Sequence, residues 1–266
     1  MKLSGRRVLV TGAAGGLGRA IAAACAAKGA FVVVTDVDGA KAEAAARKIG
    51  EDKARGYRLD VTKPDEIAAV REKVNAELGP IDALVNNAGV VFAGPLEEVA
   101  AEKHAATVAI NLGGVIAMTR EFLPDLVAKK EAAVVNIASA AAVLALPLAA
   151  SYAASKWGVL GFSDSLREEL RLQNKRRITV TAICPSFIAT GLFEGAAPAR
   201  FTRWLTAAEV AATTVRSIER KREFVMLPHS ARLLYGGLGW LPRPWFHAIC
   251  RRLGVAASMM NWKGRS

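Results

Sequence analysis

The 266-residue sequence has few cysteines, few histidines and no long apolar run. Its cysteines, Cys25, Cys184 and Cys250, are widely spaced, which argues against a disulfide framework or thiolate metal site and indicates reduced thiols. The three histidines show no ligand spacing, so no metal is expected. No apolar run reaches the ~18 residues of a membrane span, and no secretory leader is expected. We therefore expect a cytoplasmic protein, either soluble or peripheral at the inner face of a membrane.

Acidic residues are scarce toward the end of the chain. From Arg216 onward the sequence contains ten basic residues and only two acidic ones, Glu219 and Glu223. Eight of the twelve net positive charges therefore lie in the last fifth of the sequence. Such an excess suits an anionic membrane, a nucleic acid or a solvated face. No recognition motif for nucleic acid accompanies it, so we expect no nucleic-acid partner.

The composition is that of a globular protein, with 52% hydrophobic and 23% charged residues. The length suits one large α/β domain with a sizeable core. Apolar runs at 8–10, 31–35 and 132–137 read as buried strands, and helical patterns are expected at about 97–129, 150–173 and 207–220, the last capped by Thr206.

A dinucleotide site is indicated near the start of the chain. A buried strand at 8–10 is followed by a glycine-rich turn at 11–18, a helical run, and a second strand that is closed by Asp36. Glycines let the backbone approach a pyrophosphate, which the free N–H groups of the helix start can hold. A carboxylate at Asp36 can bond both ribose hydroxyls and repel a 2′-phosphate. Because no Arg or Lys stands at Val37 or inside the turn, NAD is favoured over NADP.

Tyr152 and Lys156 form a candidate acid/base pair. Residues four apart on a helix lie on one face, so the ammonium would lie beside the phenol and lower its pKa toward neutrality. Ser139, at the end of the strand at 132–137, supplies a hydroxyl that could bond a reacting oxygen. Such Tyr–Lys pairs are usually ordinary surface neighbours, and the upstream dinucleotide motif is what gives this pair its weight.

Together these motifs resemble the short-chain dehydrogenase/reductase family over about residues 5–228. The family's catalytic tetrad falls on Asn111, Ser139, Tyr152 and Lys156. By the same resemblance, cofactor-binding residues are expected at Thr11, Gly12, Gly15, Gly16, Leu17, Gly18, Asp36, Asp60, Val61, Asn87, Ala88, Gly89, Tyr152, Lys156, Pro185, Ile188 and Thr190.

The resemblance implies a fold and roles for the tetrad. The fold is a Rossmann-type, doubly wound parallel sheet of seven strands, in one domain that assembles as a homodimer or homotetramer. Asn111 is expected to hold a water that links Lys156 to solvent; the alternative is a satisfied buried amide. Asp60 is expected beside the adenine, with a turn or capping role as the alternative. Ser186 stands where the family usually has glycine, which is a mild departure.

The last part of the chain exceeds what the sheet needs. We expect a catalytic domain at 1–228, with a substrate lid at about 190–205 that carries Leu192, Phe193, Phe201 and Trp204, and a C-terminal extension at 229–266. Aromatic and basic residues alternate in this extension, which suits a membrane interface. Packing over the substrate pocket or on a neighbouring subunit is the alternative. The extension resembles, loosely, the retinol and 17β-hydroxysteroid dehydrogenase branch.

The expected activity is NAD-dependent hydride transfer to or from a lipophilic secondary alcohol or ketone, such as a retinoid, steroid or long-chain alcohol. Tyr152 would act as the general acid/base. One alternative is an NADPH-dependent reductase of 3-oxoacyl-type substrates. An alternative of another class is a catalytically silent, cofactor-sensing binding protein.

Overall fold

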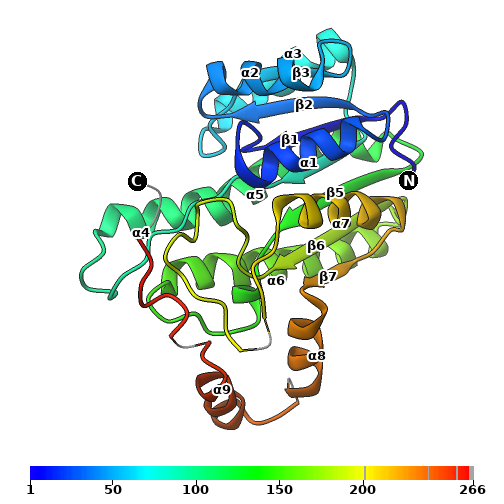
Figure 1. The fold of residues 1–266 in the computed structure, drawn as a ribbon. Coiled ribbons are helices and arrows are strands. Elements are labelled where there is room, and N and C mark those ends of the chain that lie inside the picture. Colours follow the sequence, from blue (N-terminus) through cyan, green and yellow to red (C-terminus); the bar gives the residue numbers. More distant parts are fainter. Residues whose placement is uncertain (201, 239, 256, 264–266) are drawn as a thin grey trace.

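The computed structural model describes residues 1–200, 202–238, 240–255 and 257–263. Seven parallel strands form one sheet in the order β3-β2-β1-β4-β5-β6-β7. The strands are β1 Arg7–Thr11, β2 Phe31–Asp36, β3 Ala54–Arg58, β4 Ala83–Asn86, β5 Ala132–Ile137, β6 Ile178–Pro185 and β7 Phe224–Leu227. The predicted doubly wound, seven-stranded fold is confirmed (Figure 1).

Helices cover both faces of this sheet (Figure 1). One face carries α1 Gly16–Ala26, α2 Gly39–Ile49 and α7 Ala207–Glu219, and the other carries α3 Pro64–Leu78, α4 Ala101–Val108, α5 Gly114–Val127 and α6 Ala150–Leu172. Two short helices, α8 His229–Leu238 and α9 Arg243–Arg252, follow the last strand and project from the body.

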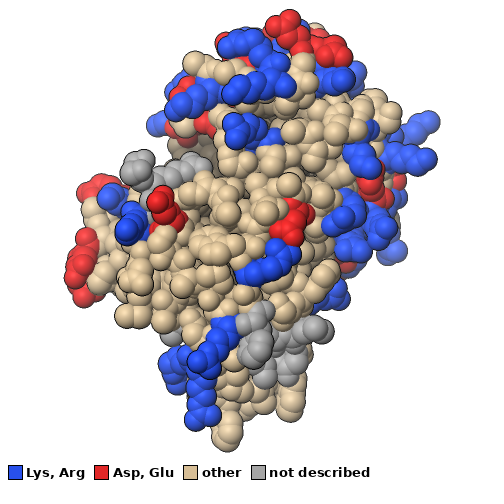
Figure 2. Space-filling model, in the orientation of Figure 1, with Lys and Arg blue, Asp and Glu red and all other residues tan. Residues whose placement is uncertain are grey.

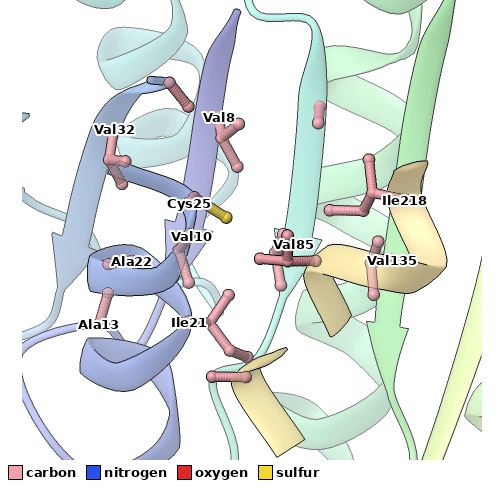
Figure 3. Packing of buried hydrophobic residues seen from close by; sticks show 14 of the residues in the cluster. Val8, Val10, Ala13, Ile21, Ala22, Cys25, Val32, Val85, Val135 and Ile218 are labelled. Atoms are coloured by element: carbon pink, nitrogen blue, oxygen red, sulfur yellow. The ribbon is translucent and has the colours of Figure 1, made fainter. Parts of the chain in front are cut away.

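The strands are apolar on both faces because both faces are covered. Val8 and Val10 of β1 pack with Ile21 and Cys25 of α1 (Figure 3), whereas Leu9 between them points into the opposite core. Two hydrophobic layers therefore clamp the sheet, and the carboxyl ends of the strands remain available for a site.

One of the predicted helices differs from the structure, and another forms as predicted. The helix expected from about residue 97 begins only at Ala101, and a π-helical turn, Ala109–Gly113, interrupts it before α5. The helix predicted at 207–220 forms as α7, and Thr206 caps it in a full capping box with Glu209.

A polar network is buried between the sheet and two helices on the face that carries α6. Asn86 of β4 donates to Asn136 of β5 over 2.8 Å and to the Thr119 hydroxyl over 3.0 Å. Asn136 donates in turn to the Ser163 hydroxyl of α6 over 2.9 Å. The network joins β4, β5, α5 and α6 beneath the carboxyl ends of the strands.

Candidate active site

The glycine turn joins β1 to α1. Gly15 is the N-cap of α1 and offers no side-chain cap, so the first N–H groups of the helix are free to hold an anion. Gly12 has φ of +61°, and a Cβ there would lie 2.9 Å from Ala88 Cα. A Cβ on Gly18 would collide with the Gly12 carbonyl oxygen. Close packing thus requires glycine at two of the predicted positions.

The segment after β4 is bonded to this turn. The Thr11 hydroxyl accepts hydrogen bonds from the backbone N–H groups of Asn87, at 2.9 Å, and Ala88, at 3.0 Å. The Asn87 amide donates back to the carbonyls of Thr11 and Gly12. Thr11 is buried and does not line the cavity described below, so it holds the two segments together rather than facing a ligand.

Two carboxylates, those of Asp36 and Asp60, line the same cavity as the glycine turn. Asp36 ends β2, and its oxygens accept from the N–H groups of Ala14, at 3.1 Å, and Asp38, at 3.3 Å. Asp60 lines the same cavity while it accepts from the backbone and hydroxyl of Thr62. Asp60 therefore has the turn role that was considered for it, together with a position on the cavity wall, whereas the N-cap of α3 is Lys63.

The three reacting groups of the predicted tetrad meet at the start of α6. Tyr152, Lys156 and Ser139 are all buried, at 4%, 5% and 8% exposure. The Ser139 hydroxyl lies near enough to the phenol to lower the pKa of Tyr152, and Lys156 Nζ lies 5.7 Å from the Tyr152 ring centroid. Nζ also donates to the Ile137 carbonyl over 2.9 Å. The arrangement places a phenol, a hydroxyl and an amine around one point.

The pKa of Tyr152 differs from the prediction. Burial raises the pKa of Tyr152 to about 12, and the hydrogen bond with Ser139 offsets this only in part. Burial also lowers the pKa of Lys156 to about 8. A low dielectric disfavours both charged forms, so in the chain alone desolvation outweighs any effect of the ammonium on the phenol. The expectation that Lys156 brings Tyr152 toward neutrality is corrected accordingly.

Both the nitrogen and the oxygen of the Asn111 side chain form hydrogen bonds within the protein. Its amide nitrogen donates to the Val90 carbonyl over 2.9 Å and to the Ser155 hydroxyl over 3.1 Å, and its oxygen accepts from Val90 N–H over 2.8 Å. Asn111 lies in the π-helical turn and is buried. Because both amide hydrogens are used, the alternative of a satisfied buried amide describes this side chain better than a water-holding role.

The segment after β6 closes the site. The backbone N–H of Ser186 donates to the Leu227 carbonyl over 2.8 Å. The φ of Ser186 does not lie in the left-handed region that favours glycine, so serine fits where the family pattern has glycine. Ile188 forms a parallel bridge with Leu205, and both side chains are buried. The departure noted in the sequence therefore leaves the local backbone ordinary.

One cavity of about 550 Å³ collects these residues. Of the predicted cofactor and catalytic positions, Thr11 and Asn111 alone are absent from its lining. The lining also includes residues that were not predicted: Val37, Leu59, Thr62, Val90, Ala106, Ala109, Ile110, Ile137, Ala138, Ser186, Leu192 and Phe193. Most are direct neighbours of predicted residues, and Leu192 and Phe193 belong to the predicted lid. Ile110 adjoins Asn111 in the sequence, and Ala106 lies four residues, about one helical turn, before Ile110.

A small apolar chamber of about 60 Å³ adjoins the cavity and shares Ser139, Ser186 and Phe193 with it. Its other walls come from the loop after β5, the lid and the C-terminal extension: Ala140, Ala141, Leu144, Ala145, Leu146, Phe187, Ala199, Arg200, Thr202, Ala231, Leu253, Val255 and Ser258. The predicted lid residue Phe201 lies outside the described residues.

The extension is hydrogen-bonded to the lid. Backbone bonds join Ala197 to Ser258 at 2.8 Å and Arg200 to Leu253 at 2.9 Å. The Trp262 indole donates to the Leu192 carbonyl over 3.1 Å. The end of the extension therefore packs against residues 190–205 and contributes to the chamber lining.

Comparison with known proteins decides the family. The short-chain dehydrogenase family model matches residues 6–200. The chain belongs to the short-chain dehydrogenase family. D-threitol dehydrogenase from Mycolicibacterium smegmatis is 40% identical to this dehydrogenase over 193 residues, which are 72% of this chain and 73% of that protein. The 3-oxoacyl-[acyl-carrier-protein] reductase FabG from Escherichia coli is 36% identical over 192 residues, 72% of this chain and 77% of FabG.

A solved structure is also similar. A short-chain dehydrogenase/reductase from Burkholderia phymatum, in complex with NAD, superposes with a TM-score of 0.79 at 26% identity, covering 90% of this chain and 96% of that one. The protein is therefore an oxidoreductase of this family. Among the described residues of the dehydrogenase, no group of three His, Cys, Asp or Glu side chains is placed to hold a metal ion.

Proposed function

We propose that this dehydrogenase transfers hydride between NAD and a secondary alcohol or ketone with an apolar substituent. The observation that carries the proposal is the position of Ser139, Tyr152 and Lys156 where a dinucleotide-sized cavity meets an apolar chamber. The alternative of a silent cofactor-sensing protein is disfavoured because Ser139, Tyr152 and Lys156 are all present and line the same cavity.

The residues of the cavity fit a nicotinamide dinucleotide. The start of α1 would hold the pyrophosphate, Asp36 the adenosine ribose, and Ile188 and Thr190 the nicotinamide end. When bound, the cofactor supplies or accepts the hydride. Asp60, Val61 and the segment at 87–89 line the walls between these points.

The catalytic roles follow from the contacts. The Ser139 hydroxyl bonds the substrate oxygen, and Tyr152, which lines the cavity beside Ser139, removes or returns the hydroxyl proton. Lys156, held by the Ile137 carbonyl, places its amine beside the phenol. Asn111 acts through another residue: it fixes Val90 on the cavity wall and Ser155 on α6.

NAD is proposed over NADP because of Asp36. Its carboxylate lines the cavity beside the exposed Val37, and a 2′-phosphate there would meet a negative charge. The rival activity, NADPH-dependent reduction of 3-oxoacyl substrates, is favoured by the likeness to FabG. D-threitol dehydrogenase and FabG bear the names of different activities, so family likeness alone does not choose between NAD-dependent oxidation and NADPH-dependent reduction.

The apolar chamber, at about 60 Å³, supports a few apolar carbon atoms beside the reacting oxygen, and we propose a lipophilic substrate in the class of retinoids, steroids and long-chain alcohols, of which only such a part would enter the chamber. Its lining is mainly alanine, leucine, valine and phenylalanine, and its shared wall contains Ser139. An alkyl substituent there would be removed from water at about 25 cal/mol per Å² of buried surface. We propose 1–228 as the catalytic unit and 229–266 as an extension that completes this chamber.

An oligomer is also proposed. Val108 and Ile116, on the helices that flank the π-turn, are 43% and 41% exposed, and Trp157 on α6 is 43% exposed. These side chains lie on the helices through which we expect two copies to pair, as a homodimer or within a homotetramer.

An oxidation assay at 340 nm tests the function. Purified protein is supplied with NAD or NADP and with either long-chain and cyclic alcohols or short polyols, and in separate reactions with NADPH and 3-oxoacyl thioesters. We expect turnover with NAD on the lipophilic alcohols. Turnover confined to NADPH and 3-oxoacyl thioesters would establish the rival activity, and no turnover with cofactor binding retained would establish the silent alternative.

The contact between the extension and the lid gives a sharper test. Gly191 and Gly195 share a φ of +83°, but only at Gly195 would a Cβ meet the extension, where it collides with the Asn261 carbonyl oxygen. Overpacking costs about 1–3 kcal/mol. We expect Gly195→Ala to lower kcat/KM on lipophilic alcohols about tenfold more than Gly191→Ala does, with short alcohols affected equally by both. Equal losses on lipophilic alcohols would contradict a role for the extension in the chamber.

A further inference from the structure

The end of the molecule formed by α8 and α9 carries positive charge without acidic residues. After Glu223 the sequence contains no Asp or Glu, whereas it contains Arg232, Arg243, Arg251 and Arg252. Figure 2 shows Lys and Arg but no acidic side chains where this end projects from the body. The four arginines are exposed, and among the described residues none of them forms an ion pair. Arg243 lies over the Trp157 ring, 5.6 Å from its centroid.

Helix α9 has two different faces. Phe246 and Cys250, four residues apart, are buried against the body, whereas Trp245 is 70% exposed. Arg252 lies seven residues after Trp245, which is two helical turns along the same face. An indole and a guanidinium are thus displayed together on the outward side of α9.

Large apolar side chains are exposed around this helix. Trp240, in the turn before α9, is 79% exposed, and Met260, after it, is 69% exposed. Indole rings with one apolar body and one polar edge are enriched at membrane–water interfaces. None of the helices among the described residues is long and apolar enough to cross a membrane, so any contact of this kind would be peripheral.

We propose that the α8–α9 end docks on an anionic lipid surface, with Trp245 in the headgroup layer and Arg251 and Arg252 on lipid phosphates. Charge complementarity and exposed indoles together identify this partner. A nucleic acid would satisfy the arginines but would leave Trp245 and Met260 without an apolar partner. A second copy of the chain would bring the same positive surfaces together, since no acidic residue lies on this segment.

The docking surface continues into the chamber wall. Leu253 and Val255, directly after α9, line the apolar chamber beside Ser139. A molecule dissolved in the lipid would thus find the chamber wall next to the docked helix. This second part of the inference rests on the proposed function, whereas docking itself does not require any catalysis.

Vesicle flotation tests the docking. The protein is mixed with vesicles of phosphatidylcholine alone or with 30% phosphatidylglycerol, without substrate. We expect binding only to the anionic vesicles, weakened at 0.5 M salt because the charges are screened. Arg251→Gln/Arg252→Gln should weaken binding about 30-fold, since each cation near such a surface contributes about 1 kcal/mol. The matched control is Lys28→Gln/Lys53→Gln, which removes two exposed cations outside α8 and α9 and should bind as the wild type does.

Trp245→Ala supplies an independent readout. It should weaken flotation and remove part of the quenching of tryptophan fluorescence by brominated lipids, while oxidation of a short, water-soluble alcohol stays unchanged. Flotation that is equal for both double variants, binding to duplex DNA but not to vesicles, or a Trp245→Ala effect confined to oligomer mass would each overturn the proposal. Vesicle binding by a protein that shows no turnover would support docking and refute only the proposed function.

Discussion

Tyr152→Phe is expected to lower kcat about a thousandfold and to leave the fold intact. General acid/base groups contribute about 10²- to 10⁴-fold, and Tyr152 lines the cavity beside Ser139, where substrate would enter. The ring is buried and packs edge-on against Phe193, a contact that phenylalanine preserves. Stopped-flow turnover and thermal unfolding measure the two effects separately.

The pH profile gives the same variant a second readout. Burial raises the pKa of Tyr152 to about 12, so the phenolate becomes more available as pH rises, and the rate of alcohol oxidation should increase from pH 7 to pH 10. Tyr57→Phe is the matched control, because the Tyr57 hydroxyl is also partly buried but bonds Glu77 away from the cavity. A Tyr152→Phe enzyme with near-normal turnover, or one that keeps the rising profile, would remove Tyr152 from the proposed mechanism.

Asp36→Asn should change the cofactor preference by about a hundredfold toward NADP. Two unit charges about 4 Å apart repel by about 4 kcal/mol at an effective dielectric of 20, so a carboxylate at this position penalises a 2′-phosphate strongly. Asparagine keeps an oxygen that can accept from Ala14 or Asp38, and the glycine turn should remain in place. The ratio of kcat/KM for NAD and NADP measures the change.

Asp38→Asn is the control for this substitution. Asp38 stands two residues away, caps α2 by accepting from Lys41 N–H over 3.0 Å, and does not line the cavity. Asparagine is an equally good cap, so this variant should keep both stability and NAD preference. A wild-type enzyme that uses both cofactors equally, or an equal change in the two variants, would contradict the role of Asp36.

Much of the fold could be predicted because the sequence shows strong local patterns. The strand expected at 132–137 has those bounds as β5, and Thr206 caps the helix after the lid as expected. Short apolar runs bounded by glycine and a serine or threonine before a helix are local features, so they do not depend on distant contacts. The positions of most cavity residues followed from the same patterns together with the family resemblance.

The features that were missed depend on contacts between distant segments. The π-helical turn around Asn111 contains an extra residue per turn. The Asn111 amide bonds Val90 and Ser155, which lie far from it in the sequence and come close to it only when the chain folds. The raised pKa of Tyr152 arises from complete burial, which residue spacing does not reveal. The bonds between lid and extension are largely backbone bonds, which carry no side-chain signal.

The polar network beneath the site has a consequence for the orientation of the catalytic helix. Ser163 lies seven residues after Lys156 and eleven after Tyr152, so all three share one face of α6. Apolar side chains alone would tolerate a small rotation of that helix, whereas the bond from Asn136 to Ser163 tolerates little. At a rise of 1.5 Å per residue, Ser163 lies about 10 Å along α6 from Lys156. The bond from Asn136 to Ser163 therefore helps to fix the directions of the Tyr152 phenol and the Lys156 amine from a distance.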